Sequence, residues 1–342
     1  MERLSKGIKR FLKVSEDYSS EDIRVVEIES DGSDRRFYRV LWENDSFVIM
    51  ENFPKTESIK KENLSYLRIA QHLNGKGLPF PSIYLYDLSE GIFILEDAGN
   101  MSLERFIKTY PNDTLTIYKR VLDILLEIQI KATDGFDTNW CYQSPYFDTD
   151  IMRRFESEYF KREFLSDFLS LRTNLNFLDP IFDHISLMAY DRKNISFLHR
   201  DFQSRNILIK KGKIYLVDWQ SARLGPPGYD LASLQIDPYV GLSEAKREEL
   251  FSYYVKRARD TKRFDMDSLL KSYPYLMLQR NMQILGAFSY LSFKKGKEKF
   301  KKFIFPAFQS LLKIISTIDD PKLLPFTRFL YDIDINSVME PR

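Results

Sequence analysis

The sequence is poor in cysteine and contains no long apolar run. Cys141 is its single cysteine, which excludes an intramolecular disulfide framework and suits a reducing compartment. We expect this thiol to be buried or inert rather than nucleophilic. No window approaches about 18 consecutive apolar residues. The opening stretch MERLSKGIKRFLKV lacks the apolar core of a signal peptide. These features predict a soluble, cytoplasmic protein with no membrane partner.

The chain also lacks an excess of charge of either sign. Lys and Arg total 51 and Asp and Glu total 49, for a formal net charge of +2. Proteins that bind nucleic acid usually carry a strong basic excess on one face, so we expect no nucleic-acid partner. The signatures G-x-S-x-G, G-x-x-x-x-G-K-[ST], C-x-x-C and H-E-x-x-H do not occur. The sequence therefore lacks the motifs that hydrolases, P-loop proteins and zinc sites usually have.

The 342 residues do contain enough apolar material for two lobes, with 44% hydrophobic and 15% aromatic residues. Before Asp97, periodicity predicts strands and one helix, over 35–42, 46–51, 58–73 and the stretches IYLYDL and GIFILED. After Asp97, long segments with apolar residues at helical spacing dominate. We therefore predict an α+β protein with a β-rich lobe over 1–97 and a mainly helical lobe over 98–342. A cleft is expected between the lobes.

One stretch, HRDFQSRNILIKKGKIYLVDWQ, interrupts the helical part with strand character. Its first residues read as the end of a strand entering an exposed loop, and the rest reads as a hairpin that turns at Lys211-Gly212. Asp218 then stands at the end of the second strand. This arrangement brings Asp201, Asn206 and Asp218 to one wall of the cleft. The alternative is that they are ordinary polar residues of a loop.

These three residues carry the chemistry of phosphoryl transfer. Carboxylate and amide oxygens are ligands suited to Mg²⁺ that carries substrate phosphates. The spacing H-x-D-x4-N with a later strand-terminal Asp is the kinase arrangement. One Asp orients the acceptor hydroxyl and takes its proton, while the Asn and the other Asp hold metal. We expect His199 to hold the loop through a backbone hydrogen bond rather than to titrate.

The stretches HRDFQSRNILI and VDWQSARLGPPGYDLASL resemble the aminoglycoside phosphotransferase-like kinases. The resemblance is strongest to the branch that phosphorylates the anomeric hydroxyl of N-acetylmuramate and N-acetylglucosamine in cell-wall recycling. It extends over roughly residues 31–308 and includes SDGSDRRFYRV, ILEDAG, DPYVGL and LQRNMQILGAF. It implies a bilobal protein-kinase-like fold, ATP as phosphoryl donor, Mg²⁺ as cofactor and a sugar as acceptor.

The resemblance also implies a role for each matching residue. Asp201 would be the catalytic base or hydroxyl-orienting residue, with Asn206 and Asp218 as metal ligands. Asp230 would support the catalytic loop. Residues that would contact the nucleotide lie in a loop over the phosphates and in a hinge at the adenine, namely Gly32, Ser33, Glu96, Asp97 and Ala98.

The chain departs from most kinases at one position. Met50 and Glu51 stand where a strand lysine usually contacts the α- and β-phosphates, and the resembling branch also lacks that lysine. A cation is still needed against the phosphate charge, and the candidates are Arg35, Arg36 and Arg39. Strand alternation places Arg35 and Arg39 on one face and Arg36 on the other. Which face meets the nucleotide stays open at this stage.

Acceptor-binding candidates come from a helix and from the catalytic loop. Glu156 and Glu158 resemble acidic positions of the family's acceptor-site helix, but residues at i and i+2 cannot share a face. We expect at most one of them to reach the cleft. Gln203 and Arg205 lie in the loop and are candidates to contact the acceptor or the transferred phosphoryl group. Arg205 is also a catalytic candidate, because a guanidinium offsets developing negative charge.

Three functions are compatible with these residues. The leading one is an ATP- and Mg²⁺-dependent kinase of a sugar hydroxyl, the anomeric one of N-acetylmuramate or N-acetylglucosamine. The second keeps the chemistry and changes the acceptor to an aminoglycoside or a choline-like amine. The third is a nucleotide-binding pseudoenzyme, which has the missing lysine as its support and the intact Asp201, Asn206 and Asp218 against it.

Overall fold

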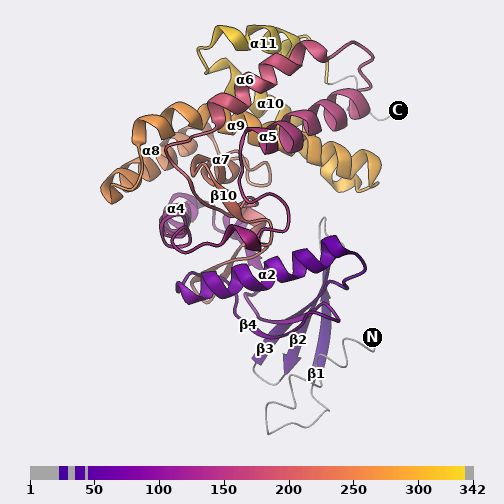
Figure 1. Cartoon of the computed structure of the whole chain (residues 1–342), viewed down its shortest axis with the longest axis vertical. Helices are drawn as coiled ribbons and strands as arrows, with labels where there is room; N and C mark the ends of the chain where they lie inside the picture. The colour runs from indigo at the N-terminus through magenta and orange to yellow at the C-terminus, as the bar shows by residue number, and fades with distance from the viewer. Residues whose placement is uncertain (1–22, 30–34, 43–44, 336–342) are drawn as a thin grey trace.

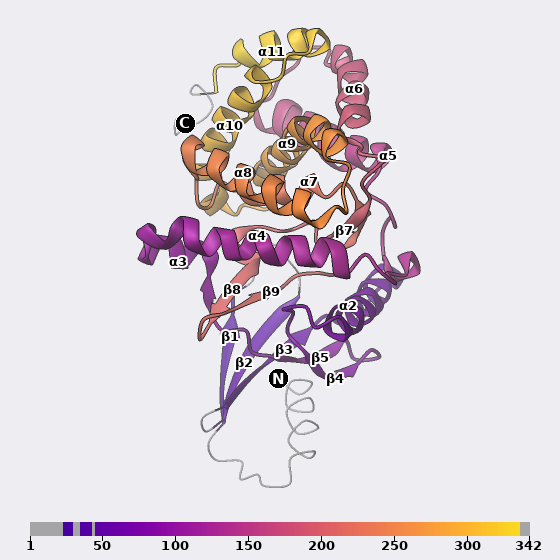
Figure 2. The same cartoon turned by 90° about the vertical axis from the view of Figure 1, so that its left-hand side faces the viewer.

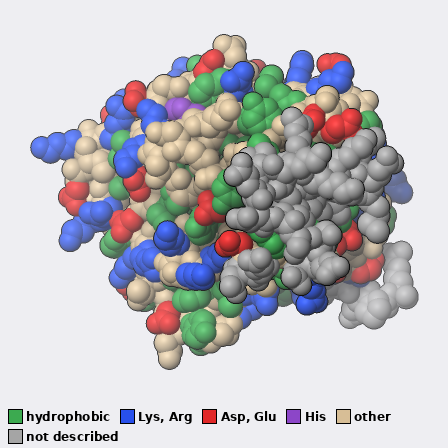
Figure 3. All heavy atoms as spheres, turned by 90° about the horizontal axis from the view of Figure 1, so that it is seen from below, with side chains coloured by type: hydrophobic (Ala, Val, Ile, Leu, Met, Phe, Trp, Pro, Cys, Tyr) green, Lys and Arg blue, Asp and Glu red, His purple; other side chains and the backbone are tan. Residues whose placement is uncertain are grey.

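The computed structural model describes residues 23–29, 35–42 and 45–335. An antiparallel sheet with one long helix forms the first lobe, and a larger helical lobe lies against it (Figure 1). The predicted α+β class with two lobes is therefore confirmed. No helix among the described residues is long and apolar enough to cross a membrane. On the face seen in Figure 3, acidic and basic side chains are interspersed over the described residues, as a near-zero net charge leads one to expect.

The sheet of the first lobe has five strands in the order β1-β2-β3-β5-β4. Their bounds are Ile23–Ile28, Arg36–Trp42, Asp45–Glu51, Ile83–Asp87 and Ile92–Glu96 for β1 to β5. Four of them match the predicted strands within a residue or two. We did not predict β1, whose four central residues are all exposed, so it has no alternation of buried and exposed positions to reveal it.

Helix α2 (Glu57–Gly75) covers one face of this sheet, in agreement with the predicted helix. Thr56 caps its N-terminus by accepting a hydrogen bond from the backbone N–H of Ile59 at 3.3 Å. The buried face of α2 joins Met50, Phe93 and Leu95 in an apolar cluster that extends into the second lobe. Alternate residues of the same strands form a smaller cluster on the opposite face.

The second lobe is organised around the long helix α9 (Met266–Ser289), which is buried along most of its length. The other α-helices of this lobe are α3 (Leu103–Thr109), α4 (Thr114–Lys131), α5 (Thr149–Met152), α6 (Asp179–Ala189), α7 (Gly228–Gln235), α8 (Glu244–Thr261), α10 (Ile304–Ser316) and α11 (Leu324–Tyr331). Helix α5 continues with π-helical winding over Arg153–Ser157 and Phe160–Phe168. Figure 2 shows α4 running beneath α7 and α8, on the side that faces the sheet.

Short strands in the second lobe carry the stretch that was singled out in the sequence. Strands β6 (Met101–Ser102), β8 (Ile207–Lys210) and β9 (Lys213–Leu216) form one sheet, and β7 (Ser196–Leu198) pairs with β10 (Arg223–Gly225). The β8–β9 hairpin turns at Lys211-Gly212, as predicted. Both turn residues have positive φ, 50° and 77°, which matches the twist that two-residue hairpins favour.

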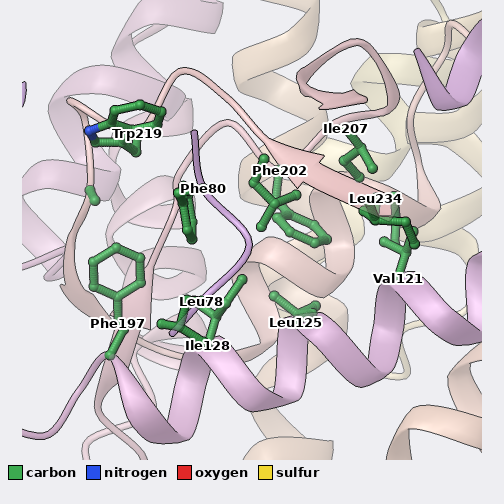
Figure 4. Packing of buried hydrophobic residues seen from close by; sticks show 14 of the residues in the cluster. Leu78, Phe80, Val121, Leu125, Ile128, Phe197, Phe202, Ile207, Trp219 and Leu234 are labelled. Carbon is green, nitrogen blue, oxygen red and sulfur yellow. The ribbon is translucent and has the colours of Figure 1, made fainter. Parts of the chain in front are cut away.

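The two lobes share one hydrophobic core (Figure 4). Trp219 is fully buried and stacks on Tyr66 of α2, with ring centroids 4.4 Å apart. Its indole N–H donates to the backbone carbonyl of Tyr66 at 2.9 Å. Phe80 packs edge-on against the same indole at 5.7 Å. The end of the β8–β9 hairpin is thereby joined to the helix of the first lobe.

A partly buried carboxylate near the far end of the second lobe predicts a pH-dependent contribution to stability. Asp320 accepts hydrogen bonds from His184 Nε2 at 2.6 Å and from the Tyr275 hydroxyl at 2.7 Å. Burial opposes ionisation, but these bonds outweigh it and lower the pKa of Asp320 to about 2. A lowered pKa stabilises the fold above the unfolded-state value of about 4, and this contribution is lost as the pH falls toward 2.

We expect Asp320→Asn to lower the free energy of unfolding by about 2 kcal/mol at pH 7, because charged hydrogen bonds are lost. The difference from the wild type should shrink between pH 5 and pH 3 in urea unfolding. The exposed neighbour Asp319 provides the control, since Asp319→Asn should change stability little at either pH. A constant difference for Asp320→Asn across this range would contradict the prediction.

Candidate active site

A cavity of about 890 Å³ opens between the lobes. Strands β2, β3 and β5 line one side, and the loop after β7, the end of the β8–β9 hairpin and α9 line the other. Asp201, Asn206 and Asp218 all line it, together with Gln203 and Arg205. The structure therefore brings together the residues that the kinase-like spacing selects.

Two buried carboxylates hold the loop that carries Asp201. Asp230 accepts hydrogen bonds from the backbone N–H groups of His199 at 2.6 Å and Arg200 at 3.0 Å. Asp237 accepts one from the backbone N–H of Ser204 at 2.7 Å. The backbone at Arg200 has a φ of 77°, an unfavourable conformation for a residue with a side chain, which must be held by its surroundings.

His199 is packed rather than exposed. Its ring is buried, stacks on Phe80 at 6.1 Å and meets Phe202 edge-on at 6.0 Å. Burial lowers the pKa of His199, although Asp201 and Asp218 act in the opposite direction. The imidazole is therefore neutral near pH 7, and the hydrogen bond that ties this residue to the loop support comes from its backbone N–H.

Asn206 and Asp218 lie side by side at the hairpin. The backbone N–H of Val217 donates to the carbonyl of Asn206 at 3.0 Å, and the Asn206 side-chain amide donates to the carbonyl of Asp201 at 2.9 Å. Asp218 has a φ of 73° and accepts hydrogen bonds from Arg35 and Gln220. Burial would raise the pKa of Asp218, but the adjacent Arg35 outweighs it and keeps this pKa below its ordinary value.

The donor set at this wall fits Mg²⁺ bound together with phosphates. Within the described ranges, no cluster of three or more His, Cys, Asp or Glu side chains could hold a metal by itself. Asn206 and Asp218 offer amide and carboxylate oxygens, and Asp218 already has a positive group against it. Mg²⁺ usually takes one or two protein oxygens and completes its shell with phosphate oxygens and water. Asn206 and Asp218 can supply those protein oxygens.

The segment after β5 is tightly bonded. The carboxylate of Asp97 accepts hydrogen bonds from Arg39 Nε and Nη2, both at 3.0 Å, and from the Ser46 hydroxyl at 2.7 Å. Burial works against ionisation, but these bonds lower the pKa of Asp97. Glu96 accepts a hydrogen bond from the Tyr215 hydroxyl at 2.8 Å. Glu96, Asp97 and Ala98 all line the cavity.

The three candidate arginines are placed differently. Arg35 and Arg39 line the cavity with Phe37 between them. Arg36 is exposed and is not among the cavity-lining residues. The alternation seen in the sequence is present, and the face of β2 with Arg35 and Arg39 is the one that meets the cavity. Gly32 and Ser33, the candidates for the phosphate-covering loop, lie outside the described residues.

Neither acidic candidate of the acceptor-site helix lines the cavity. Glu156 is completely buried and bonded to Arg200 Nη1 at 3.1 Å and to the Tyr229 hydroxyl. Burial raises the pKa of Glu156 even though Arg200 acts against it. Glu158 is 39% exposed and pairs with Arg153. At most one of the two was expected to reach the cleft, and because neither lines the cavity, neither is placed to contact an acceptor there.

Arg205 is held by residues that we did not select from the sequence. Its Nε donates to Glu104 of α3 at 2.7 Å, and its guanidinium lies 3.7 Å from the ring centroid of Tyr239. A cation over an aromatic ring gains attraction from the ring face. Arg205 therefore joins the catalytic loop to α3.

Arg280 of α9 is a further cavity residue that the sequence did not reveal. It is 4% exposed, donates to Gln283 at 2.9 Å and places Nη1 3.8 Å from Asp201 Oδ1. Arg280 stands between Gln279 and Asn281, and such a run of polar residues in a helix with many apolar residues could have drawn attention. Asp237 also went unselected, and it lies two residues after the end of α7.

Replacing the loop-supporting carboxylates should mobilise the loop. In Asp230→Asn or Asp237→Asn, an amide N–H₂ replaces one accepting oxygen, so a buried backbone N–H loses its partner at a cost of about 1–3 kcal/mol. We expect amide hydrogen exchange over 199–206 to speed up roughly tenfold or more. Hydrogen–deuterium exchange with mass spectrometry measures this.

Asp191 provides a matched control. It is also buried and accepts backbone N–H groups of Lys193 and Asn194 at 3.2 Å, but it lies away from the cavity lining. Asp191→Asn should accelerate exchange locally and leave 199–206 unchanged. Equal protection of 199–206 in all three variants would show that these carboxylates do not hold the loop.

Comparison with known proteins gives a consistent picture. The model of the phosphotransferase enzyme family matches residues 24–269. An N-acetylmuramate/N-acetylglucosamine kinase of Pseudomonas aeruginosa is 24% identical over 282 residues, which cover 81% of this chain and 79% of that protein. A protein of the same name from Neisseria meningitidis is 23% identical over 309 residues, with 87% of each chain covered.

Solved structures show the same architecture. Choline kinase LicA from Streptococcus pneumoniae superposes with a TM-score of 0.60 at 15% sequence identity, covering 92% of this chain and 100% of that one. LicA in complex with AMP matches with a TM-score of 0.56 at 16% identity, covering 90% and 98%. The likeness shows that the fold is shared over nearly the full length.

Proposed function

The chain belongs to the phosphotransferase enzyme family and has its bilobal, protein-kinase-like fold, and from this premise we propose that it phosphorylates the anomeric hydroxyl of an N-acetyl amino sugar with ATP and Mg²⁺. The observation that carries the proposal is the convergence of Asp201, Asn206 and Asp218 on one cavity between the lobes. The sequence predicted both the family and a phosphotransferase.

We assign the donor to the part of the cavity under the sheet. Val48 and Leu95 give this part apolar walls, and the segment from Glu96 to Ala98 forms its edge. An apolar slot with backbone groups at one side suits a purine ring. The hydrogen bonds of Asp97 to Arg39 and Ser46 hold the segment in place. In this proposal, residues 1–97 act as the nucleotide-binding lobe and 98–342 carry the catalytic loop and the acceptor.

Each residue of the catalytic wall has a proposed task. Asp201 accepts the proton of the attacking hydroxyl, and its orientation depends on a loop supported by Asp230 and Asp237. Asn206 and Asp218 hold Mg²⁺, which when bound neutralises charge on the donor phosphates. Arg205 is a positioning residue, because its Nε is bonded to Glu104 of α3 and its guanidinium lies over the ring of Tyr239.

The chemistry of the opposite wall supports a neutral or acidic acceptor over a cationic one. Residues 280–300 contribute Arg280, Gln283 and Lys299 as polar groups to the cavity and no carboxylate. A polycationic aminoglycoside needs several carboxylates, and a hydroxyl-rich sugar needs hydrogen-bonding groups of the kind present here. The names of the relatives from P. aeruginosa and N. meningitidis point to the same acceptor class.

Asp201→Asn should strongly slow transfer while leaving nucleotide binding intact. We expect kcat to fall by about 10²- to 10⁴-fold, the usual contribution of a general base, with the Kd for Mg²⁺·ATP unchanged within about a factor of three. Transfer from [γ-³²P]ATP to N-acetylmuramate and N-acetylglucosamine and calorimetric titration measure the two quantities. Wild-type-like turnover in this variant would remove Asp201 from the mechanism.

A small acceptor panel tests the sugar. Glucose, kanamycin, choline and the methyl glycoside of N-acetylglucosamine join the two amino sugars. The methyl glycoside has its anomeric oxygen blocked, so a transfer to C1 predicts no label on it and an acid-labile phosphate on the free sugars. Label on the blocked sugar would place the reaction at another hydroxyl. Label on kanamycin or choline alone would show that the acceptor is not an N-acetyl amino sugar.

A further inference from the structure

We propose that Arg35 is the phosphate-binding cation of this site and that, before the donor binds, it occupies the position of the metal on Asp218. Donor binding would then require the guanidinium to exchange Asp218 for phosphate oxygens while Glu62 keeps it in place. This inference rests on the proposed function, because it assigns phosphates and a divalent ion to the cavity.

Strand register explains why the cation comes from Arg35, the residue directly before β2. Met50 of β3 is fully buried, and it shares a face with the cavity-lining Val48. Met50 therefore stands, with an apolar side chain, at the position of β3 where most kinases have the lysine that contacts the phosphates. Phe37 of β2 pairs directly with Met50. Arg35 precedes Phe37 by two residues, so it lies on the same face and beside the substituted position.

The contacts of Arg35 match those expected of such a cation. Its side chain is 8% exposed and its Nη2 is hydrogen-bonded to Asp218 Oδ1. Its Nε lies 3.9 Å from Glu62 Oε1 on α2, and its guanidinium lies 5.8 Å from the ring centroid of Phe37. A guanidinium has five N–H donors in a planar fork, a geometry suited to phosphate.

Three other arginines of the cavity are engaged with groups that are not metal ligands. Arg39 makes two bonds to Asp97 and a third, at 2.8 Å, to the Gly99 carbonyl. Arg205 is bonded to Glu104 and Arg280 to Gln283. Arg35 differs from these three because its carboxylate partner is Asp218, the residue that would bind Mg²⁺.

Without bound phosphate, electrostatic repulsion makes Arg35 and a divalent ion compete for Asp218. A divalent ion bound to Asp218 beside the guanidinium would place like charges within a few ångströms, and their repulsion is strong in a partly buried site. A nucleoside triphosphate brings enough negative charge to hold both. Metal and nucleotide should therefore bind cooperatively, and Arg35 should be the source of that coupling, since each then increases the affinity for the other.

The test is binding of Mn²⁺, as a paramagnetic probe of the divalent site, in the absence of nucleotide. Electron paramagnetic resonance reports the free ion directly. Removing Arg35 leaves Asp218 as a partly buried charge without this partner. We expect Arg35→Gln to bind Mn²⁺ at least on the order of tenfold more tightly than the wild type, and Arg35→Lys to stay close to the wild type. Asp218→Asn added to Arg35→Gln should abolish the gain.

Nucleotide affinity should change in the opposite direction. Calorimetric titration of ATP without metal should show binding weakened about tenfold or more in Arg35→Gln and largely kept in Arg35→Lys. Arg68→Gln provides a control, since it removes an exposed arginine of α2 that lies outside the cavity lining. It should match the wild type in both titrations, and thermal unfolding checks that each variant is folded.

The outcomes separate this inference from the proposed function. If Mn²⁺ and metal-free ATP bind equally well to the wild type and to folded Arg35→Gln, Arg35 is neither the phosphate cation nor a competitor for the metal. That result would leave sugar phosphorylation standing. If the binding changes appear as expected but no acceptor of the panel is labelled, the sugar assignment fails and the role of Arg35 stands. Mn²⁺ that binds equally well after Asp218→Asn overturns the inference by locating the ion elsewhere.

Discussion

The packing of Trp219 against α2 is the interaction on which the geometry of the site depends. Asp218, immediately before this tryptophan, has a positive φ, and such a conformation persists only where neighbouring contacts hold it. The indole supplies those contacts through its stack on Tyr66 and its hydrogen bond to the Tyr66 carbonyl. Glu62 stands one helical turn before Tyr66. One buried side chain therefore sets the distance between carboxylates that belong to different lobes.

Charge in the cavity is arranged in pairs, which follows from the cost of burying an isolated ion. Arg39 pairs with Asp97, Arg205 with Glu104 and Arg35 with Asp218. Each pair joins elements that are distant in sequence, so neutralising the charge also fixes the relative positions of strands, helices and the catalytic loop. The formal charge of the chain is +2, yet its site contains several strongly localised charges. The net charge of a protein affects which charged partners it attracts, whereas the ion pairs within its site fix the geometry of that site.

Local sequence was a reliable guide wherever one face of an element is buried. The strands around Phe47 and Phe93, helix α2 and the hairpin at Lys211-Gly212 follow from alternation, helical spacing and turn chemistry. Strand β1 was not predicted, because its central residues are exposed and show no alternation of buried and exposed positions. The acceptor-site helix was the weakest interpretation, because no local pattern of residues indicates that Glu156 is buried. Glu156 lies in a pair with Arg200 and not at the cavity.

The sequence by itself determined the family, the two-lobed α+β class and the set of Asp201, Asn206 and Asp218. These depend on the order and spacing of residues within single segments. Tertiary structure decided which face of β2 meets the cavity, that Arg280 lies beside Asp201, and that Asp237 supports the same loop as Asp230. It also decided that Arg35 contacts Asp218, 183 positions along the chain. The physical reason is that contacts between distant segments depend on how the lobes pack around a shared core, and no local pattern of residues records that packing.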